Sequence, residues 1–192
     1  MEQPAENSAA AAALEQEIAR LYRSEAPGML RYAASLCGDA EAAHDAVQEA
    51  FFRFFIARSA GQQFQAPKAW LYRVLRNYIV DQKRSFLRKE VGLESALHLP
   101  SPTPNPGPGA ASGRLLQRAK QLGLSAREVE CFRLRGEGLR YEEIAAVLGL
   151  QSGTVGALLA RAHGKIRQAL GEVSGKPRDF TLPVVGEKRY AS

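Results

Sequence analysis

Residues 141–170 read YEEIAAVLGLQSGTVGALLARAHGKIRQAL, and this stretch decides the fold of the C-terminal half. Ala145 lies where two helices must approach closely, Gly149 lies where the chain must turn, and Val155 lies where a second helix packs back. This spacing is typical of a helix-turn-helix, whose second helix lies in the major groove of DNA. An ordinary helical hairpin within a core is the alternative. We therefore expect nucleic acid to be the default partner of the chain.

The composition is that of a soluble globular protein of one or two domains: 192 residues, of which 45% are hydrophobic and 24% charged. No apolar run approaches the roughly 20 residues of a membrane span. The N-terminal stretch MEQPAENSAAAAALEQE is acidic, whereas a secretory leader begins with basic residues. These features predict a cytoplasmic protein without membrane insertion.

No catalytic or metal-binding cluster is visible in the sequence. Cys37 and Cys131 lie in different segments, which predicts buried apolar filler in a reducing cytosol. The three histidines, His44, His98 and His163, show no metal-ligand spacing. We therefore expect no catalytic residue, no metal and no cofactor.

The net charge of +6 is unevenly distributed along the chain. Residues 1–65 carry 5 basic and 9 acidic side chains, residues 66–89 carry 7 basic and 1 acidic, and residues 113–170 carry 10 basic and 5 acidic. A solvated helix face explains any single charged run. Two separate basic segments behind an acidic front indicate two contacts with a polyanion and one contact with something else.

The stretch LPSPTPNPGPGAASG, at 99–113, is the clearest domain boundary, because its prolines and glycines prevent packing. Helical periodicity dominates elsewhere, so the sequence predicts an all-α protein of two small helical domains, the second a four-helix domain containing the helix-turn-helix. A capping box at Ser125 and Glu128 predicts the start of one helix. The expected helices are 10–37 (broken or kinked at Pro27), 39–58, 67–89, 114–122, 125–135, 141–148 and 153–170. The expected parts are a flexible N-terminus at 1–13, a first domain at 14–91, a linker at 92–112, a second domain at 113–171 and a tail at 172–192.

The helix expected at 67–89 has a cationic face opposite its apolar stripe. Trp70 lies at the edge of this face, which carries Arg73, Arg76, Asn77, Lys83 and Arg84. Cations for phosphates beside an aromatic ring for an unstacked base are typical of single-strand binding. The alternative is that Trp70 folds back into the core.

The helix expected at 39–58 carries a mixed acidic and aromatic face, made of Asp45, Gln48, Glu49 and Phe52. An exposed phenylalanine ringed by polar groups is a typical anchor for a protein partner. The alternative, that Phe52 packs under the first helix, stays open at this point. On the helix expected at 153–170, Ser152 is the expected N-cap, and the side chains expected to face outward are Thr154, Ala157, Arg161, Lys165 and Gln168.

Together these segments resemble the extracytoplasmic-function (ECF) sigma factors of bacterial RNA polymerase. In the first half the resemblance depends on DAVQEAFFRFF and PKAWLYRVLRNYIVDQKR, and in the second half on LSAREVECFRLR, YEEIAAVLGL and SGTV. It covers nearly all of 20–90 and 113–170, and the order of the motifs on either side of a linker makes it specific.

The resemblance implies a sigma factor that directs polymerase core to promoters and assists DNA opening, without covalent chemistry. The implied partners are the clamp helices of the largest polymerase subunit, the flap of the second-largest subunit, promoter DNA and an anti-sigma factor. The implied polymerase-binding residues are Asp45, Gln48, Glu49 and Phe52. The implied melting residues near the start site are Trp70, Arg73, Arg76, Asn77, Asp81, Lys83 and Arg84, with Gln63 and Phe64 in a loop at 61–65 that pockets a flipped-out base. The implied readers of the upstream element are Gln151, Ser152, Thr154, Ala157, Arg161 and Lys165.

The sequence departs from the family pattern in two places. Gly156 and Ala157 open a stretch, GALLA, where a basic or polar cluster is usual, so we expect looser or methyl-directed upstream reading. Arg140 replaces the serine that usually caps the helix before the turn.

Two other classes of function are open to the sequence. A stand-alone helix-turn-helix regulator would bind duplex DNA without polymerase, and would need a dimer interface or ligand pocket. An enzyme acting on nucleic acid would need an acidic metal cluster or an activated nucleophile.

Overall fold

The computed structural model describes residues 3–91, 117–119 and 121–169, and within these ranges it contains helices and no strand. The labelled helices are α1 (Gln3–Cys37), α2 (Ala40–Ser59), α3 (Pro67–Val91), α5 (Ala126–Gly136), α6 (Tyr141–Leu148) and α7 (Ser152–Ala169). The all-α prediction is confirmed, with the helix bounds for α2, α3, α5, α6 and α7 within two residues of those expected. The predicted linker at 92–112 and the tail at 172–192 lie outside the described residues.

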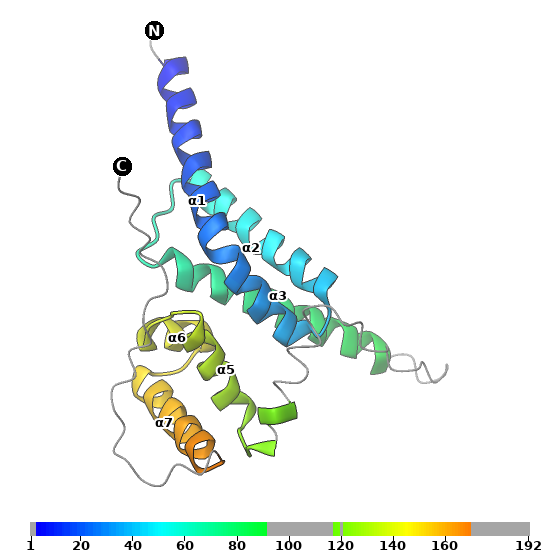
Figure 1. Ribbon diagram of the computed structural model, residues 1–192. Helices are drawn as coiled ribbons and strands as arrows, with labels where there is room; N and C mark the ends of the chain where they lie inside the picture. The colour runs from blue at the N-terminus through cyan, green and yellow to red at the C-terminus, as the bar shows by residue number, and fades with distance from the viewer. Residues whose placement is uncertain (1–2, 92–116, 120, 170–192) are drawn as a thin grey trace, which may run out of the picture.

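The first half is a bundle in which α1 and α3 both pack on α2, and α1 also packs on α3 (Figure 1). Asp39 caps α2, its carboxylate accepting a hydrogen bond from the backbone N–H of Ala42 at 2.8 Å. This cap fixes the tight turn between α1 and α2. The core side chains of α3 include Leu71, Tyr72 and Leu75, which are fully buried.

Of the two outcomes expected at Pro27, the break is wrong, because α1 continues through it to Cys37, and the kink stays a prediction. A proline inside a helix removes one backbone hydrogen bond and costs about 3 kcal/mol. Burial of Met29, Tyr32 and Ala33 directly after it offsets this cost, because each is at most 1% exposed. Tertiary packing therefore keeps α1 helical where the local signal predicts an interruption.

The helix-turn-helix is formed by α6 and α7, between which the chain bends by 103°. Gly149 ends α6 in the left-handed region, at φ +65°, and its N–H donates to the carbonyl of Ala145. Only glycine adopts this conformation without a steric penalty, which explains its position at the turn. Val155 is fully buried where α7 packs back on α5 and α6, as the spacing predicts.

The capping box predicted at Ser125 is confirmed. The Ser125 hydroxyl accepts from the N–H of Glu128 at 3.3 Å, and the Glu128 carboxylate accepts from the N–H of Ser125 at 2.7 Å. Cys131 is buried in the core, as expected, and Cys37 is half-buried.

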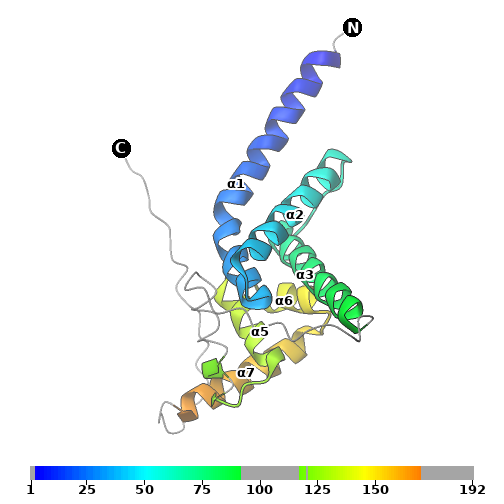
Figure 2. The same cartoon turned by 90° about the vertical axis from the view of Figure 1, so that its right-hand side faces the viewer.

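The two halves lie against each other. Helix α3 packs on α6, and a continuous hydrophobic core contains Tyr32, Tyr72 and Ile79 of the first half and Leu134 and Ile144 of the second. Figure 2 shows α5 and α6 beneath the first-half bundle.

Gly28 of α1 lies at this contact between the halves. A Cβ atom placed on it would lie 2.6 Å from a carboxylate oxygen of Glu137 and 2.7 Å from the hydroxyl of Tyr72. The absence of a side chain therefore leaves room for the Glu137 carboxylate and the Tyr72 hydroxyl beside α1.

No single helix within the described ranges is long and apolar enough to cross a membrane, although α6 and α7 taken together, as a bent pair, reach that length and composition.

Candidate polymerase and nucleic-acid interface

The outward face of α2 carries the residues predicted to bind polymerase. Asp45, Gln48 and Phe52 are exposed, and Phe52 retains 59% of its accessible surface. The alternative in which Phe52 packs under α1 is therefore wrong. Glu49 is half-buried and accepts a hydrogen bond from Arg53 at 2.6 Å. The exposed Phe52 ring therefore lies beside one acid that is paired, Glu49, and one that is exposed, Asp45.

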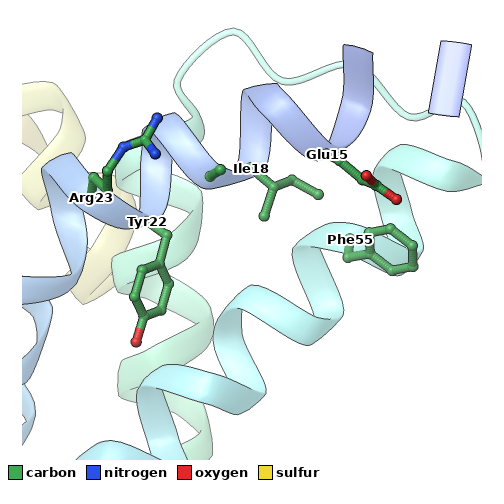
Figure 3. A pocket seen from close by; sticks show the side chains of 6 residues that line it. Glu15, Ile18, Tyr22, Arg23 and Phe55 are labelled. Carbon is green, nitrogen blue, oxygen red and sulfur yellow. The ribbon is translucent and has the colours of Figure 1, made fainter. Parts of the chain in front are cut away.

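An apolar groove of about 440 Å³ runs beside this face, between α1 and α2 (Figure 3). Its lining consists of Glu15, Ile18, Ala19, Tyr22, Arg23 and Phe55. Tyr22 is 43% exposed and Phe55 is 44% exposed, although the sequence pattern places Phe55 on the buried side of its helix. Sequence reasoning missed this groove, because it arises from the angle between two helices.

Three aromatic rings meet at the start of α3. Trp70 lies 4.7 Å from Phe64 and 5.7 Å from Phe54, measured between ring centroids, and Phe54 lies 5.0 Å from Phe64. Trp70 and Phe64 are both half-buried. Trp70 therefore lies at the edge of the core, with part of its surface available beside the polar face.

The solvent side of α3 carries polar groups next to these rings. The side chains of Arg73, Asn77, Asp81 and Arg84 are exposed, as is Gln63 in the preceding loop. Cationic and amide groups beside a partly open indole can contact a phosphate backbone and an unstacked base together. These four side chains of α3 and Gln63 are exposed beside the aromatic rings, and their role in DNA binding remains a prediction.

Two cations of the predicted melting set contact other parts of the chain. Arg76 is half-buried, and its Nε donates to the carboxylate of Glu130 on α5 at 2.7 Å. Lys83 is exposed but donates to the carbonyl of Leu36 at 2.5 Å. The expectation that Arg76 faces solvent is therefore wrong in this conformation, because α5 approaches from the second half.

A second, smaller groove of about 290 Å³ lies between α2 and α3, lined by Arg53, Tyr78, Asp81, Gln82 and Ser85. The guanidinium carbon of Arg53 lies 5.8 Å from the centroid of the Tyr78 ring, as in a cation–π pair. The contact bridges α2 and α3.

The start of α7 presents the residues predicted to read duplex DNA. Gln151, Ser152, Thr154, Ala157 and Arg161 are all exposed. Ser152 is the expected N-cap of α7. In the structure it is the first residue inside the helix. Glu143 supports the preceding helix by accepting from the N–H of Arg140 at 2.6 Å, and Arg140 makes no side-chain cap.

Lys165 does not face outward as expected. Its ammonium group donates to the carboxylate of Glu128 and to the carbonyl of Gly123, each at 2.8 Å. The pKa of Glu128 is lowered to about 2, and the hydrogen bond from Lys165 makes the largest contribution to this shift. The sequence pattern missed the interaction because Glu128 lies on another helix, at a position fixed only by tertiary packing.

Within the described ranges, no group of three or more histidine, cysteine, aspartate or glutamate side chains could hold a metal ion.

Comparisons with known proteins agree with this geometry. The family model for sigma-70 region 2 matches residues 21–89, and the model for sigma-70 region 4 matches residues 122–166. The ECF RNA polymerase sigma factor SigL of Mycobacterium tuberculosis is 34% identical over 169 residues, which cover 86% of this chain and 96% of SigL. The chain belongs to the ECF sigma factors.

Other members of the family show the same relationship. The ECF sigma factor EcfG of Rhodopseudomonas palustris is 30% identical over 164 residues, covering 83% of this chain and 90% of EcfG. Among solved structures, the sigma factor RpoE in complex with the anti-sigma factor NepR from Bartonella quintana aligns with a TM-score of 0.57 at 25% identity, over 81% of this chain and 96% of RpoE. CnrH, solved with the cytosolic domain of CnrY, shares the fold at a TM-score of 0.55 and 24% identity, over 86% of this chain and 96% of CnrH.

This sigma factor therefore directs RNA polymerase to promoters in transcription initiation. The region 2 match runs from α1 to α3, and the region 4 match runs from the residues before α5 into α7. The stand-alone regulator is not favoured by these relationships.

Proposed function

We propose that the outward face of α2, made of Asp45, Gln48, Glu49 and Phe52, binds the clamp helices of the largest polymerase subunit. The support is the exposure of Phe52 among acidic and amide groups. Desolvated aromatic anchors of this kind dominate protein–protein affinity. The groove between α1 and α2 adjoins this face and extends the apolar surface available to polymerase.

The N-terminal part of α3 and the loop at 61–65 capture the melted strand near the start site. The observation that carries this role is the cluster of Phe54, Phe64 and Trp70 beside the exposed Arg73 and Asn77. Stacking an unpaired base on an aromatic ring contributes roughly 1–3 kcal/mol. Melting here is capture, because binding of unstacked bases shifts the equilibrium between closed and open DNA by their differential affinity.

The other residues of the predicted melting set act as phosphate and base contacts along the same helix. Asp81 and Arg84 extend the exposed face, and Gln63 lies in the loop before it. Lys83 and Arg76 join this surface only after leaving their present partners, Leu36 and Glu130.

The helix-turn-helix of α6 and α7 reads the upstream element in duplex form. The exposed start of α7 carries Gln151, Ser152, Thr154 and Ala157, with Arg161 one turn further on. Backbone N–H groups at a helix start meet phosphates, and side chains beyond them read base edges. Ala157 favours contact with a thymine methyl group. Lys165 adds to the positive electrostatic potential near the DNA and makes no direct contact with it.

The functional units correspond to 14–91 and 113–171, joined by a linker at 92–112 and preceded and followed by segments at 1–13 and 172–192. The second unit also meets the flap of the second-largest polymerase subunit. The chain acts in the cytoplasm without covalent chemistry, and an anti-sigma factor is a further partner. The solved complex of the related RpoE with the anti-sigma factor NepR supports that last assignment.

The deciding experiment compares promoter binding and transcription with and without polymerase core. We expect specific binding and run-off transcripts only when core and this chain are combined. Core alone is the control, and it should give no transcript from the same promoter. Specific duplex binding by the isolated chain, without any transcript on addition of core, would support the stand-alone regulator instead.

A further inference from the structure

Charged groups hold the contact between the two halves of the chain. The Nε of Arg76 and the hydroxyl of Tyr32 both donate to one oxygen of Glu130, at 2.7 Å and 3.1 Å. Arg31 donates from Nε to Glu137 at 3.1 Å, and its terminal nitrogen donates to the other oxygen of the same carboxylate at 2.5 Å. Two glutamates of the second half, one on α5 and one directly after it, thus bind three groups of α1 and α3.

The polar groups at this contact are incompletely satisfied. Arg133 donates through one terminal nitrogen to the carbonyl of Ser35 at 3.3 Å. Its other terminal nitrogen, and the hydroxyl of Tyr72, are buried with no hydrogen-bond partner among the described residues. Burial also lowers the pKa of Arg133. A buried unpaired polar group costs about 1–3 kcal/mol, so this contact is less favourable than a permanent core of the same size.

The contact occupies groups that the proposed function assigns to DNA. While Arg76 bonds to Glu130, its Nε cannot also bond to a phosphate. Because α6 packs along α3, the helix-turn-helix formed by α6 and α7 is held beside the helix that captures the melted strand. The predicted linker of 92–112 could extend to roughly 70 Å, at about 3.4 Å per residue, so covalent linkage does not require this proximity.

We propose that this arrangement is a closed resting form, in which Glu130 takes the place of a DNA phosphate on Arg76 and must leave before α3 and α7 engage a promoter. This inference rests on the proposed role of α3 in strand capture. The cations come from the first half and the carboxylates from the second, so the same charge complementarity that attracts DNA closes the chain on itself. Polymerase binding and promoter binding then favour the separated form, because in the closed form Glu130 occupies the Nε of Arg76 and the side chain is half-buried.

The first test removes one charge from this contact. Glu130→Gln keeps the shape of the side chain and replaces a charged hydrogen-bond acceptor, a loss that shifts the closed-to-open ratio by roughly tenfold. Glu142→Gln is the matched control, because Glu142 is exposed on α6 and the same single charge is lost. We expect small-angle X-ray scattering to give a larger radius of gyration for Glu130→Gln than for Glu142→Gln and wild type. Equal radii for all three chains would overturn the closed form.

The same variants test the functional consequence with polymerase core present. We expect Glu130→Gln to form open complexes several-fold faster than wild type at equal concentration, and Glu142→Gln to match wild type. If both variants accelerate equally, the effect is general charge reduction and the assignment of Glu130 is wrong.

A second test locks the contact shut. Arg31→Cys and Glu137→Cys are combined in a chain carrying Cys37→Ser and Cys131→Ala, and the new thiols are joined by a bismaleimide with a cleavable disulfide spacer. We expect the cross-linked chain to lose at least tenfold in promoter opening with core, and cleavage by reductant to restore it. Equal opening before and after cleavage would refute the need for separation.

These outcomes are separable from failure of the proposed function. If replacement of Trp70 leaves promoter opening unchanged, the role of α3 in strand capture is wrong. The claim that Glu130 competes with a DNA phosphate for Arg76 is then wrong as well. The scattering comparison still decides on its own whether the chain closes through Glu130.

Discussion

The ammonium group of Lys165 on α7 forms an ion pair with the carboxylate of Glu128 on α5, at 2.8 Å, and Glu128 is only 3% exposed. The same carboxylate accepts the N–H of Ser125 at the start of α5. This buried acid therefore links the cap of one helix to the last turns of another. Breaking a buried pair by removing one partner is strongly destabilising, because the remaining charge has no compensation.

Replacing Lys165 by methionine should destabilise the second half of the chain. We expect the free energy of unfolding to fall by about 2–3 kcal/mol, because the Glu128 carboxylate stays buried without its cation. Arg161→Met is the control, since Arg161 is exposed on the same helix and should change stability by less than about 0.5 kcal/mol. Urea unfolding followed by circular dichroism measures both, and equal stability of the two variants would contradict the structural role of Lys165.

The same ion pair predicts how stability depends on pH. The pKa of Glu128 is lowered from 4.5 to about 2, first by the bond from Lys165 and then by the backbone bond from Ser125. A carboxyl whose pKa is lower in the folded state stabilises the fold above the unfolded pKa. That contribution should be complete above about pH 4.5 and should decline as the pH falls towards 2.

The measurement is the free energy of unfolding of wild type and Glu128→Gln between pH 6 and pH 2.5. Glutamine cannot titrate, so its curve should be flatter than that of wild type in the window below pH 4.5. Identical slopes would show that Glu128 does not carry the dependence.

Replacing Trp70 by alanine should reduce promoter opening without loss of polymerase binding. The change removes the ring that contacts Phe54 and Phe64, so we expect at least a tenfold loss of thymine reactivity to permanganate in the open complex. Trp70→Phe keeps an aromatic surface and should retain most of the activity. If alanine and phenylalanine variants open DNA as well as wild type, the capture role is wrong.

Replacing Phe52 by serine should weaken binding to polymerase core by tenfold or more, because an aromatic anchor at an interface centre typically contributes at least 2 kcal/mol. Stability should hardly change, since Phe52 is 59% exposed. Phe86→Ser is the matched control, because Phe86 is 62% exposed and lies on α3 rather than on α2. Fluorescence anisotropy of labelled chain titrated with core measures both affinities, and equal losses would contradict a specific role of Phe52.

Replacing Arg161 by alanine should weaken upstream DNA binding by the holoenzyme in a salt-dependent way. The plot of log affinity against log salt concentration has a negative slope, and losing one phosphate contact reduces the size of that slope by about 0.9. Gln168→Ala, on an exposed position of the same helix, should leave the slope unchanged. An unchanged slope for Arg161→Ala would show that this side chain makes no phosphate contact.

Two glycines of the helix-turn-helix should respond to alanine with opposite signs. Gly149 has φ +65°, so Gly149→Ala should cost about 1 kcal/mol of stability. Gly164 lies inside α7 with open space around it, so Gly164→Ala should stabilise the helix by up to about 1 kcal/mol. Thermal unfolding measures both shifts, and a destabilising Gly164→Ala would mean that this helix is strained at that point.

The local features of the fold could be predicted from the sequence because they depend on neighbouring residues. The capping box at Ser125, the turn at Gly149 and the helix of 141–148 each arise from residues within a few positions of each other. The outward face of α2 could be predicted from the helical period, but the sequence left open whether Phe52 is exposed there or packs under α1.

The partners of Arg76 and Lys165 could not be predicted, because they belong to other helices. Helical periodicity placed both cations on an outward face, yet Glu130 and Glu128 of α5 reach them from another helix. A face of one helix is free only if no other element packs on it, and a single sequence does not contain that information. The groove at Phe55 was missed for the same reason, as was the continuity of α1 through Pro27.

Gly28 gives this contact an unusual sensitivity to a single carbon atom. Since a methyl group there would lie 2.6 Å from a Glu137 carboxylate oxygen and 2.7 Å from the Tyr72 hydroxyl, Gly28→Ala requires the ends of these two side chains to move, and Glu137 belongs to the second half. A displaced Glu137 carboxylate would lose its bonds from Arg31, so one added methyl group on α1 would disturb the polar contact between the two halves.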